Sequence, residues 1–198
     1  MSAPRILAFS GSLRTGSFNA MLLRTAVKGA RAAGGEVTEL SLADYPLPIY
    51  HGDHEASNGL PENARRLKAV FMEHDGLLLA CPEYNSSIAP LMKNTIDWVS
   101  RAAPNEAGLA AFVGKVAALV SASPGGLGGL RGLRHMRDVL SDIMVVVLPA
   151  PFMVAVPRAH EAFDAHGMLK DAKLAAAVEA VGARLVKTVA AHRATVER

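Results

Sequence analysis

The sequence of 198 residues contains one cysteine, Cys81, and aromatic residues make up only 5% of it. A single cysteine excludes an intramolecular disulfide framework and fits a reducing compartment. No apolar run approaches the roughly 18 residues that a membrane-spanning helix needs. The opening residues, with Pro4 and Arg5 just before an apolar stretch, do not have the form of a secretion signal. We therefore expect a cytoplasmic protein with no membrane partner.

The chain also lacks a dense block of Lys or Arg. Its net charge of +3 is mild, which argues against a nucleic-acid partner but allows weak attraction of small anions. A content of 51% hydrophobic and 20% charged residues is that of an ordinary globular protein. The length suits one domain, so we expect residues 1–198 to form a single domain.

Short apolar runs alternate with helical patterns along the chain. Continuous apolar runs predict strands buried on both faces, whereas the alternating run 36–40 predicts an edge strand. Five strands with crossover helices predict an α/β fold, a doubly wound five-stranded parallel sheet in the order 2-1-3-4-5. The four continuous runs are 5–9, 76–80, 116–120 and 144–148, and helical stripes cover about 60–73, 88–101, 129–140 and 174–189.

The first unusual loop, SGSLRTGSFN at 10–19, follows the first predicted strand and precedes a helix. Strand, Gly/Ser loop and helix together offer N–H groups and a helix N-terminus to an anion. The pattern GxxxxGS lacks the Lys of a nucleotide P-loop, which favours a single monophosphate held by neutral donors. The alternative is a simple strand-to-helix turn capped by Ser17. The donors are the hydroxyls of Ser10, Ser12, Thr15 and Ser17 and the amide of Asn19.

The second unusual loop is CPEYNSSIAP at 81–90. It presents Glu83, Tyr84 and Asn85 at a strand end, where a planar heterocycle can lie against backbone amides and Tyr84. The alternative is a proline-shaped helix cap with a surface tyrosine. We interpret Cys81 as a buried apolar residue, because no base partner for it can be named.

The third unusual loop is SASPGGLGGLRGLR at 121–134. Glycines at 125, 126, 128 and 129 allow the backbone to approach a flat ligand closely. Arg131 and Arg134 follow, and they either meet a phosphate or a subunit partner or lie on the solvated surface.

In this order and spacing, the three loops resemble the NAD(P)H-dependent FMN reductase family. That family consists of flavodoxin-like proteins and includes quinone, azo-dye and chromate reductases. The middle stretch, PEYN…S…P…KN.IDW, is the most specific part, and the resemblance runs from about residue 4 to 150. It implies one FMN per chain, with NADPH or NADH as co-substrate. It also implies a flavodoxin-like, FMN-binding domain.

The resemblance implies a role for each loop. The phosphate of FMN would meet Ser10, Arg14, Ser17 and Asn19, with Ser12 and Phe18 beside them. The isoalloxazine would lie along Pro82, Glu83, Tyr84 and Asn85. Ser123, Gly125 and Gly126 would flank the ring and its pyrimidine edge. One departure is Pro124, which stands where many relatives carry glycine and removes a backbone donor.

The function that follows is an NAD(P)H-dependent, FMN-containing oxidoreductase. It would pass electrons from nicotinamide to quinones, azo dyes, flavins or chromate-like oxyanions by a ping-pong mechanism. No catalytic acid or base is expected, since the chemistry belongs to the flavin, and Tyr84 would only shape the substrate pocket. His51, Asp53 and His54 lack convincing ligand spacing, so we expect a solvated loop and no metal site.

The alternative function is a flavodoxin-type electron carrier. Such carriers are usually acidic and cover both flavin faces with aromatic rings. This chain is mildly basic, and Tyr84 is the only aromatic residue in the three loops apart from Phe18 at the start of the first helix. The family also pairs subunits, which implies a homodimer or homotetramer through the helix that carries Met92, Trp98 and Val99. NADH and NADPH both remain open.

Overall fold

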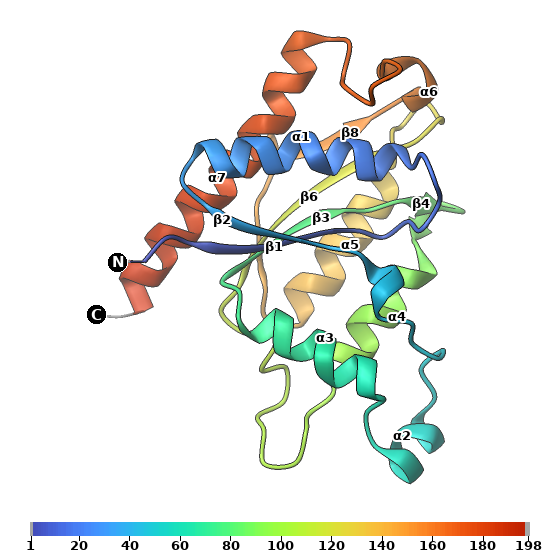
Figure 1. Ribbon diagram of the computed structural model, residues 1–198, viewed down its shortest axis with the longest axis vertical. Coiled ribbons are helices and arrows are strands. Elements are labelled where there is room, and N and C mark those ends of the chain that lie inside the picture. Colours follow the sequence, from blue (N-terminus) through green and yellow to red (C-terminus); the bar gives the residue numbers. More distant parts are fainter. Residues whose placement is uncertain (1, 197–198) are drawn as a thin grey trace.

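The computed structural model describes residues 2–196, arranged as a central parallel sheet with helices on both faces (Figure 1). The sheet has the strand order β2-β1-β3-β6-β7, and β8 also pairs with β6. The predicted doubly wound fold and its strand order are therefore confirmed. The strands are β1 (Arg5–Ser10), β2 (Glu36–Leu40), β3 (Gly76–Ala80), β6 (Val116–Ala122), β7 (Val146–Val147) and β8 (Met153–Val156).

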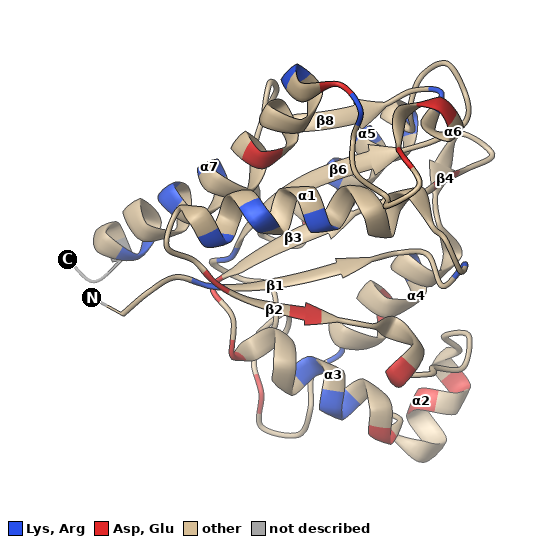
Figure 2. Cartoon of the chain, turned by 45° about the horizontal axis from the view of Figure 1, so that its top comes forward, with Lys and Arg blue, Asp and Glu red and all other residues tan. Residues whose placement is uncertain are grey.

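Alternate residues of the central strands face opposite layers, which explains their continuous apolar runs. Ile6 and Ala8 of β1 pack with α1 (Phe18–Ala32) and α7 (Ala172–Val196). Leu7 and Phe9 face the other layer. That layer consists of α3 (Glu62–Met72), α4 (Pro90–Val99) and α5 (Leu130–Asp142). Figure 2 shows charge on the helices, the loops and edge strand β2, but none on β3 or β6.

The fifth sheet position departs from the predicted strand at 144–148. Only Val146–Val147 forms β7, against the start of β6, and β8 takes over against Leu119–Ala122. Two prolines, Pro149 and Pro151, lie between the two segments and supply no N–H to the ladder. The prediction that Met144 is buried in a strand is wrong. Its backbone has the left-handed conformation of a turn (φ 69°), and its side chain is 63% exposed.

Four further short elements have no counterpart in the sequence prediction. Strands β4 (Glu83–Tyr84) and β5 (Ser87–Ile88) form a hairpin inside the second loop. The 3-10 helix η1 (Leu42–Asp44) follows β2, and α6 (Ala159–Ala162) follows β8. The segment expected as a solvated loop around His54 is instead α2 (Gly52–Asn58), and the His54 ring meets Trp98 edge-on at 6.1 Å.

Trp98 belongs to the interior of the chain. Its indole N–H donates to the Pro48 carbonyl at 2.8 Å, and its ring meets Tyr50 edge-on at 5.1 Å. Met92, Trp98 and Val99 are each at most 1% exposed. These three side chains are therefore part of the core of this chain, and they are not available for contact with another subunit.

Candidate flavin site at the carboxyl edge of the sheet

The first loop ends in a helix N-terminus that is free to bind an anion. Ser17 is the N-cap of α1, and its hydroxyl accepts a hydrogen bond from Ala20 N–H at 3.4 Å. Within residues 2–196, the N–H groups of Phe18 and Asn19 have no hydrogen-bond partner. The first turn of α1 also carries no acidic residue. The positive end of the helix dipole is therefore uncompensated, which suits a phosphate.

Asn19 braces the first loop against the third. Its side-chain NH₂ donates to the Ala122 carbonyl at 2.9 Å, and its side-chain oxygen accepts from Ala122 N–H at 3.0 Å. The side-chain oxygen and one hydrogen of the side-chain NH₂ are thereby engaged in a buried contact. The backbone N–H and the second hydrogen of the side-chain NH₂ are left for a ligand contact by Asn19.

Hydroxyl groups shape the turn between β1 and α1. Ser10 accepts from Ser12 N–H and Ser12 accepts from Arg14 N–H, both at 3.3 Å. The Arg14 guanidinium lies 5.2 Å from the centroid of the Phe18 ring. Phe18 in turn stacks on Phe163 at 5.9 Å. Arg14 is exposed and forms no ion pair within 2–196, so it is available to a phosphate.

The second loop is a tight hairpin between β3 and α4. Asn85 (φ 49°) and Ser86 (φ 67°) are its two turn residues, and both have the positive φ of a type I′ turn. Asn85 is therefore placed at the turn rather than in the pocket. Tyr84, at 50% exposed, projects from the hairpin with its ring available to a ligand.

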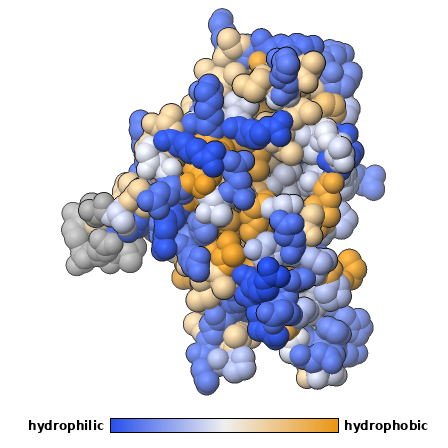
Figure 3. All heavy atoms as spheres, in the orientation of Figure 1, coloured by the Kyte–Doolittle hydropathy of each residue, from blue (hydrophilic) through white to orange (hydrophobic). Residues whose placement is uncertain are grey.

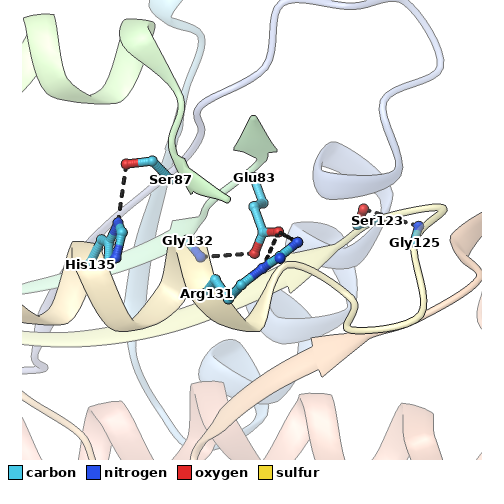
Figure 4. Close-up of polar contacts among 7 residues, drawn as sticks. All are labelled: Glu83, Ser87, Ser123, Gly125, Arg131, Gly132 and His135. Atoms are coloured by element: carbon cyan, nitrogen blue, oxygen red, sulfur yellow. Dashed lines mark hydrogen bonds and ion pairs between the residues drawn. The ribbon is translucent and has the colours of Figure 1, made fainter. Parts of the chain in front are cut away.

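Glu83 fastens this hairpin to α5. Its carboxylate accepts from Gly132 N–H at 2.9 Å and from Arg131 Nη2 at 2.8 Å (Figure 4). Ser87 lies 3.1 Å from His135 Nδ1 and makes a second tie to the same helix. Burial raises the pKa of the Glu83 carboxyl, but the Gly132 N–H and the Arg131 guanidinium outweigh it, so the pKa is lower than usual.

The four glycines of the third loop have two different roles. A Cβ at Gly129 (φ 92°) would lie 1.9 Å from Ser121 Oγ, and one at Gly128 would lie 2.6 Å from the Val156 backbone. These two glycines are required for packing and for the backbone turn. At Gly126 nothing lies within 4 Å, and its N–H has no partner within 2–196. The N–H of Gly125 is held by Ser123 Oγ at 3.2 Å.

The three loops enclose a pocket of about 290 Å³. Its size is at the low end of small-molecule sites. It opens at the switch point, where the helices that follow the paired strands β1 and β3 lie on opposite faces of the sheet. Four predicted residues, Ser10, Asn85, Gly125 and Gly126, are not among those that line it. Ala122, which the sequence gives no reason to select, lines it together with Pro124. The predicted residues that line it are Ser12, Arg14, Ser17, Phe18, Asn19, Pro82, Glu83, Tyr84 and Ser123.

Cys81 lies beneath this pocket as a buried residue, as predicted. It is 1% exposed, and burial raises the pKa of its thiol well above the usual range. No three His, Cys, Asp or Glu side chains gather as a metal site in the described part of the chain. Between residues 2 and 196, no helix is long and apolar enough to span a membrane.

Comparisons with known proteins agree with this geometry. The model of the NADPH-dependent FMN reductase family matches residues 4–161. The chain belongs to this family. FMN is accordingly its cofactor, and NAD(P)H is its co-substrate.

The relatives resemble the chain over most of its length. An NAD(P)H-dependent FMN reductase of Pseudomonas aeruginosa is 39% identical over 170 residues, 85% of this chain and 86% of that protein. A quinone reductase of Escherichia coli is 36% identical over 74% of each chain. The solved structure of FerB, an NAD(P)H:(acceptor) oxidoreductase of Paracoccus denitrificans, aligns with a TM-score of 0.79 at 29% identity, over 96% of this chain and 98% of its own. An archaeal flavodoxin (TM-score 0.59, 11% identity, 93% and 98% covered) shares the fold, which confirms the flavodoxin-like class.

The residues present fit FMN. Unpaired N–H groups at the start of α1 and the exposed Arg14 match a terminal phosphate. The open backbone at Gly126 leaves room for a flat ring to approach the third loop. Tyr84 borders the same pocket from the opposite loop.

Proposed function

We propose that this protein is a single-domain oxidoreductase that uses FMN to carry electrons from NAD(P)H to quinones. The main support is the pocket between the three loops, which offers an anion site at one end and an accessible aromatic ring at the other. Two relatives, a quinone reductase of Escherichia coli and an NADPH:quinone oxidoreductase of Arabidopsis thaliana, support the acceptor class.

Bound FMN would supply the redox chemistry by accepting a hydride from nicotinamide and reducing the acceptor. The residues of the protein would bind and orient the FMN and the substrates. Phe18 N–H, Asn19 N–H and the Ser17 hydroxyl would hold the phosphate, and the unpartnered Gly126 N–H would be available to the ring. The Glu83 carboxylate is occupied by Gly132 and Arg131, so it is not offered as an acid or base. Tyr84 shapes the substrate pocket through its ring.

The same pocket supports a ping-pong order of binding. FMN itself would take up much of the pocket of about 290 Å³, so little room would remain for nicotinamide and an acceptor together. Both must come within about 3–3.5 Å of the same reacting atom, so the oxidised nicotinamide leaves first. An open mouth also suits azo dyes, flavins and chromate-like oxyanions, and we include these acceptors in the proposal.

An absorbance spectrum of the purified protein tests the core of this proposal. We expect an FMN spectrum that NADPH or NADH bleaches without oxygen and that a benzoquinone restores. A protein without flavin would contradict the proposal, and so would a bound flavin that neither nicotinamide bleaches, as expected of an electron carrier. Steady-state rates at several quinone levels should give parallel double-reciprocal lines, and converging lines would contradict the ping-pong order.

We also propose a homodimer or homotetramer in the cytoplasm. Leu13, Tyr84 and Leu127 in the three loops are each about half exposed, and a second subunit would cover them. The buried, unpaired Cys81 requires no oxidising compartment. Light scattering of an active sample should give a multiple of 20.8 kDa. The mass of one chain would contradict the oligomer.

A further inference from the structure

A depression of about 300 Å³ lies at the amino edge of the sheet, at the opposite end of the strands from the flavin pocket. It is bounded by the residues just before β3 and β6, by the loop 110–114 and by the last turns of α7. Figure 1 shows the start of β1 and the end of α7 on this same side of the molecule. Figure 3, in the same orientation, shows several strongly hydrophilic side chains on this side. The proposed function gives this depression no role.

The wall of the depression contains a buried ammonium group without a counter-ion. Lys115 directly precedes β6, lines the depression and is only 7% exposed. Its Nζ donates to the His74 carbonyl, but it forms no ion pair within residues 2–196. A buried charge without a partner is costly, and burial accordingly lowers the pKa of the Lys115 ammonium. A bound anion would supply the missing counter-charge.

Two neighbours offer further hydrogen-bonding groups to the same ligand. His192 of α7 lines the depression, and its buried Nε2 has no partner within residues 2–196. Gly114 has a left-handed backbone (φ 76°), and its N–H also lacks an acceptor in the described part of the chain. An imidazole nitrogen donates or accepts according to its protonation, so it can pair with a phosphate, which carries both acceptor oxygens and a P–OH group.

The carboxylate in the depression is already compensated. Asp75 Oδ2 accepts from Arg5 N–H at 2.8 Å and lies 3.3 Å from Arg193 Nη1. Among the described residues that line the depression, Asp75 is the only acidic one, whereas Lys115 and Arg193 are both cationic. One positive charge is therefore left over, which favours an anionic ligand.

We propose that this depression is a second ligand site, which binds a small oxyanion such as inorganic phosphate through Lys115 Nζ, His192 Nε2 and Gly114 N–H. Its volume is at the low end of small-molecule sites, so it suits a small anion with its water rather than a nucleotide. This inference does not depend on the proposed function, because it uses none of the residues of the three loops.

Calorimetric titration of the FMN-loaded enzyme with sodium phosphate tests the site, since bound FMN occupies the anion site of α1. Sodium chloride should hold the ionic strength at about 0.15 M, so that diffuse attraction is screened. We expect saturable binding of one phosphate per chain. Lys115→Met should weaken it at least tenfold, which is roughly the worth of a charge-assisted hydrogen bond. His192→Phe should weaken it about three- to tenfold. His192→Gln should bind phosphate more tightly than His192→Phe, because the Gln amide nitrogen can take the place of Nε2.

Lys187→Gln is the matched control, since it removes one charge from an exposed position of α7 outside the depression. It should leave the phosphate dissociation constant at the wild-type value. His192→Phe removes no hydrogen bond within residues 2–196, so it keeps the test decisive even if Lys115→Met does not fold. Phosphate binding that fails to saturate, that His192→Phe leaves unchanged, or that Lys187→Gln weakens equally would overturn the inference.

Discussion

Within residues 2–196, several polar groups at the amino ends of the strands pair with one another, whereas at the carboxyl ends several backbone N–H groups have no partner. Asp75, just before β3, accepts from Arg5 N–H at 2.8 Å and from Arg193 Nη1 at 3.3 Å. The buried Lys115 ammonium donates to the His74 carbonyl. These contacts tie the start of β3 to β1, β6 and α7, which suits a stabilising role, although a depression of about 300 Å³ remains beside them and the buried His192 Nε2 has no partner within residues 2–196.

The carboxyl edge has the opposite character. Phe18, Asn19 and Gly126 keep free N–H groups, and the Arg14 guanidinium is exposed. Free donors contribute little to folding but bind an anion without breaking existing bonds. A change at the amino edge should therefore affect stability rather than FMN affinity, and a change at the carboxyl edge should affect FMN affinity most.

Removing Asp75 should give the largest effect and test the amino edge. Asp75→Ala leaves the Arg5 N–H and Arg193 without their acceptor, so we expect the free energy of unfolding to fall by about 2–4 kcal/mol. The FMN dissociation constant should stay at the wild-type value. Urea unfolding and flavin-fluorescence titration measure the two quantities. Glu73→Ala, an exposed acidic residue two positions away, is the control and should change stability little.

Ser17→Ala tests the carboxyl edge. Loss of one charge-assisted phosphate contact should weaken FMN binding by about 1.5–3 kcal/mol, while loss of the N-cap lowers stability by only about 1 kcal/mol. Asp171→Ala is the control, because Asp171 caps α7 by accepting from Lys173 N–H at 2.8 Å. It should lose comparable stability without loss of FMN affinity. If both variants retained wild-type FMN affinity, the phosphate assignment of the first loop would be wrong.

The sheet could be predicted because burial on both faces leaves a direct trace in the sequence. Runs such as Gly76–Ala80 have no polar residue, since either face meets a helix layer. The two segments that fill the fifth sheet position, β7 and β8, show no such continuous buried run. Val146 is half exposed, and β8 is a four-residue segment, too short to show periodicity.

The three loops could be located, but the role of each residue depends on distant partners. Nothing near Asn19 indicates that its amide meets Ala122, 103 residues away. The glycine run likewise gives no sign that two of its members differ. A side chain at position 129 would collide with Ser121, whereas Gly126 has open space around it. From the PEYN motif, Glu83 is predicted to contact the ligand. In the structure its carboxylate instead binds Gly132 N–H and Arg131 of α5.

Glu83 combines features of both edges, because its carboxylate is paired, as at the amino edge, but lies at the carboxyl edge beside the pocket. Glu83→Gln should lower stability at pH 7 by about 1–3 kcal/mol, the usual cost of losing hydrogen bonds to a charged group. Its folded pKa is lower than the ordinary value of 4.5, so its contribution is present above that pH and is lost as the pH falls through the folded pKa. Urea unfolding between pH 3 and 7 should show a shallower acid-side decline for Glu83→Gln than for the wild type or Glu73→Gln. Equal slopes would contradict the assignment of this carboxylate as an anchor.

The smallest expected effect is a gain in stability at the hairpin turn. Ser86 has φ 67°, a conformation that costs a non-glycine residue about 1–2 kcal/mol. Glycine removes that cost but loses more backbone entropy on folding, so Ser86→Gly should stabilise the protein by about 0.5–1 kcal/mol. Asn85→Gly is the matched comparison and should gain less, because asparagine tolerates the left-handed region better than serine does. Thermal unfolding of both variants measures the difference. If Ser86→Gly destabilised the protein, the type I′ turn would not be the conformation that holds Tyr84 at the pocket.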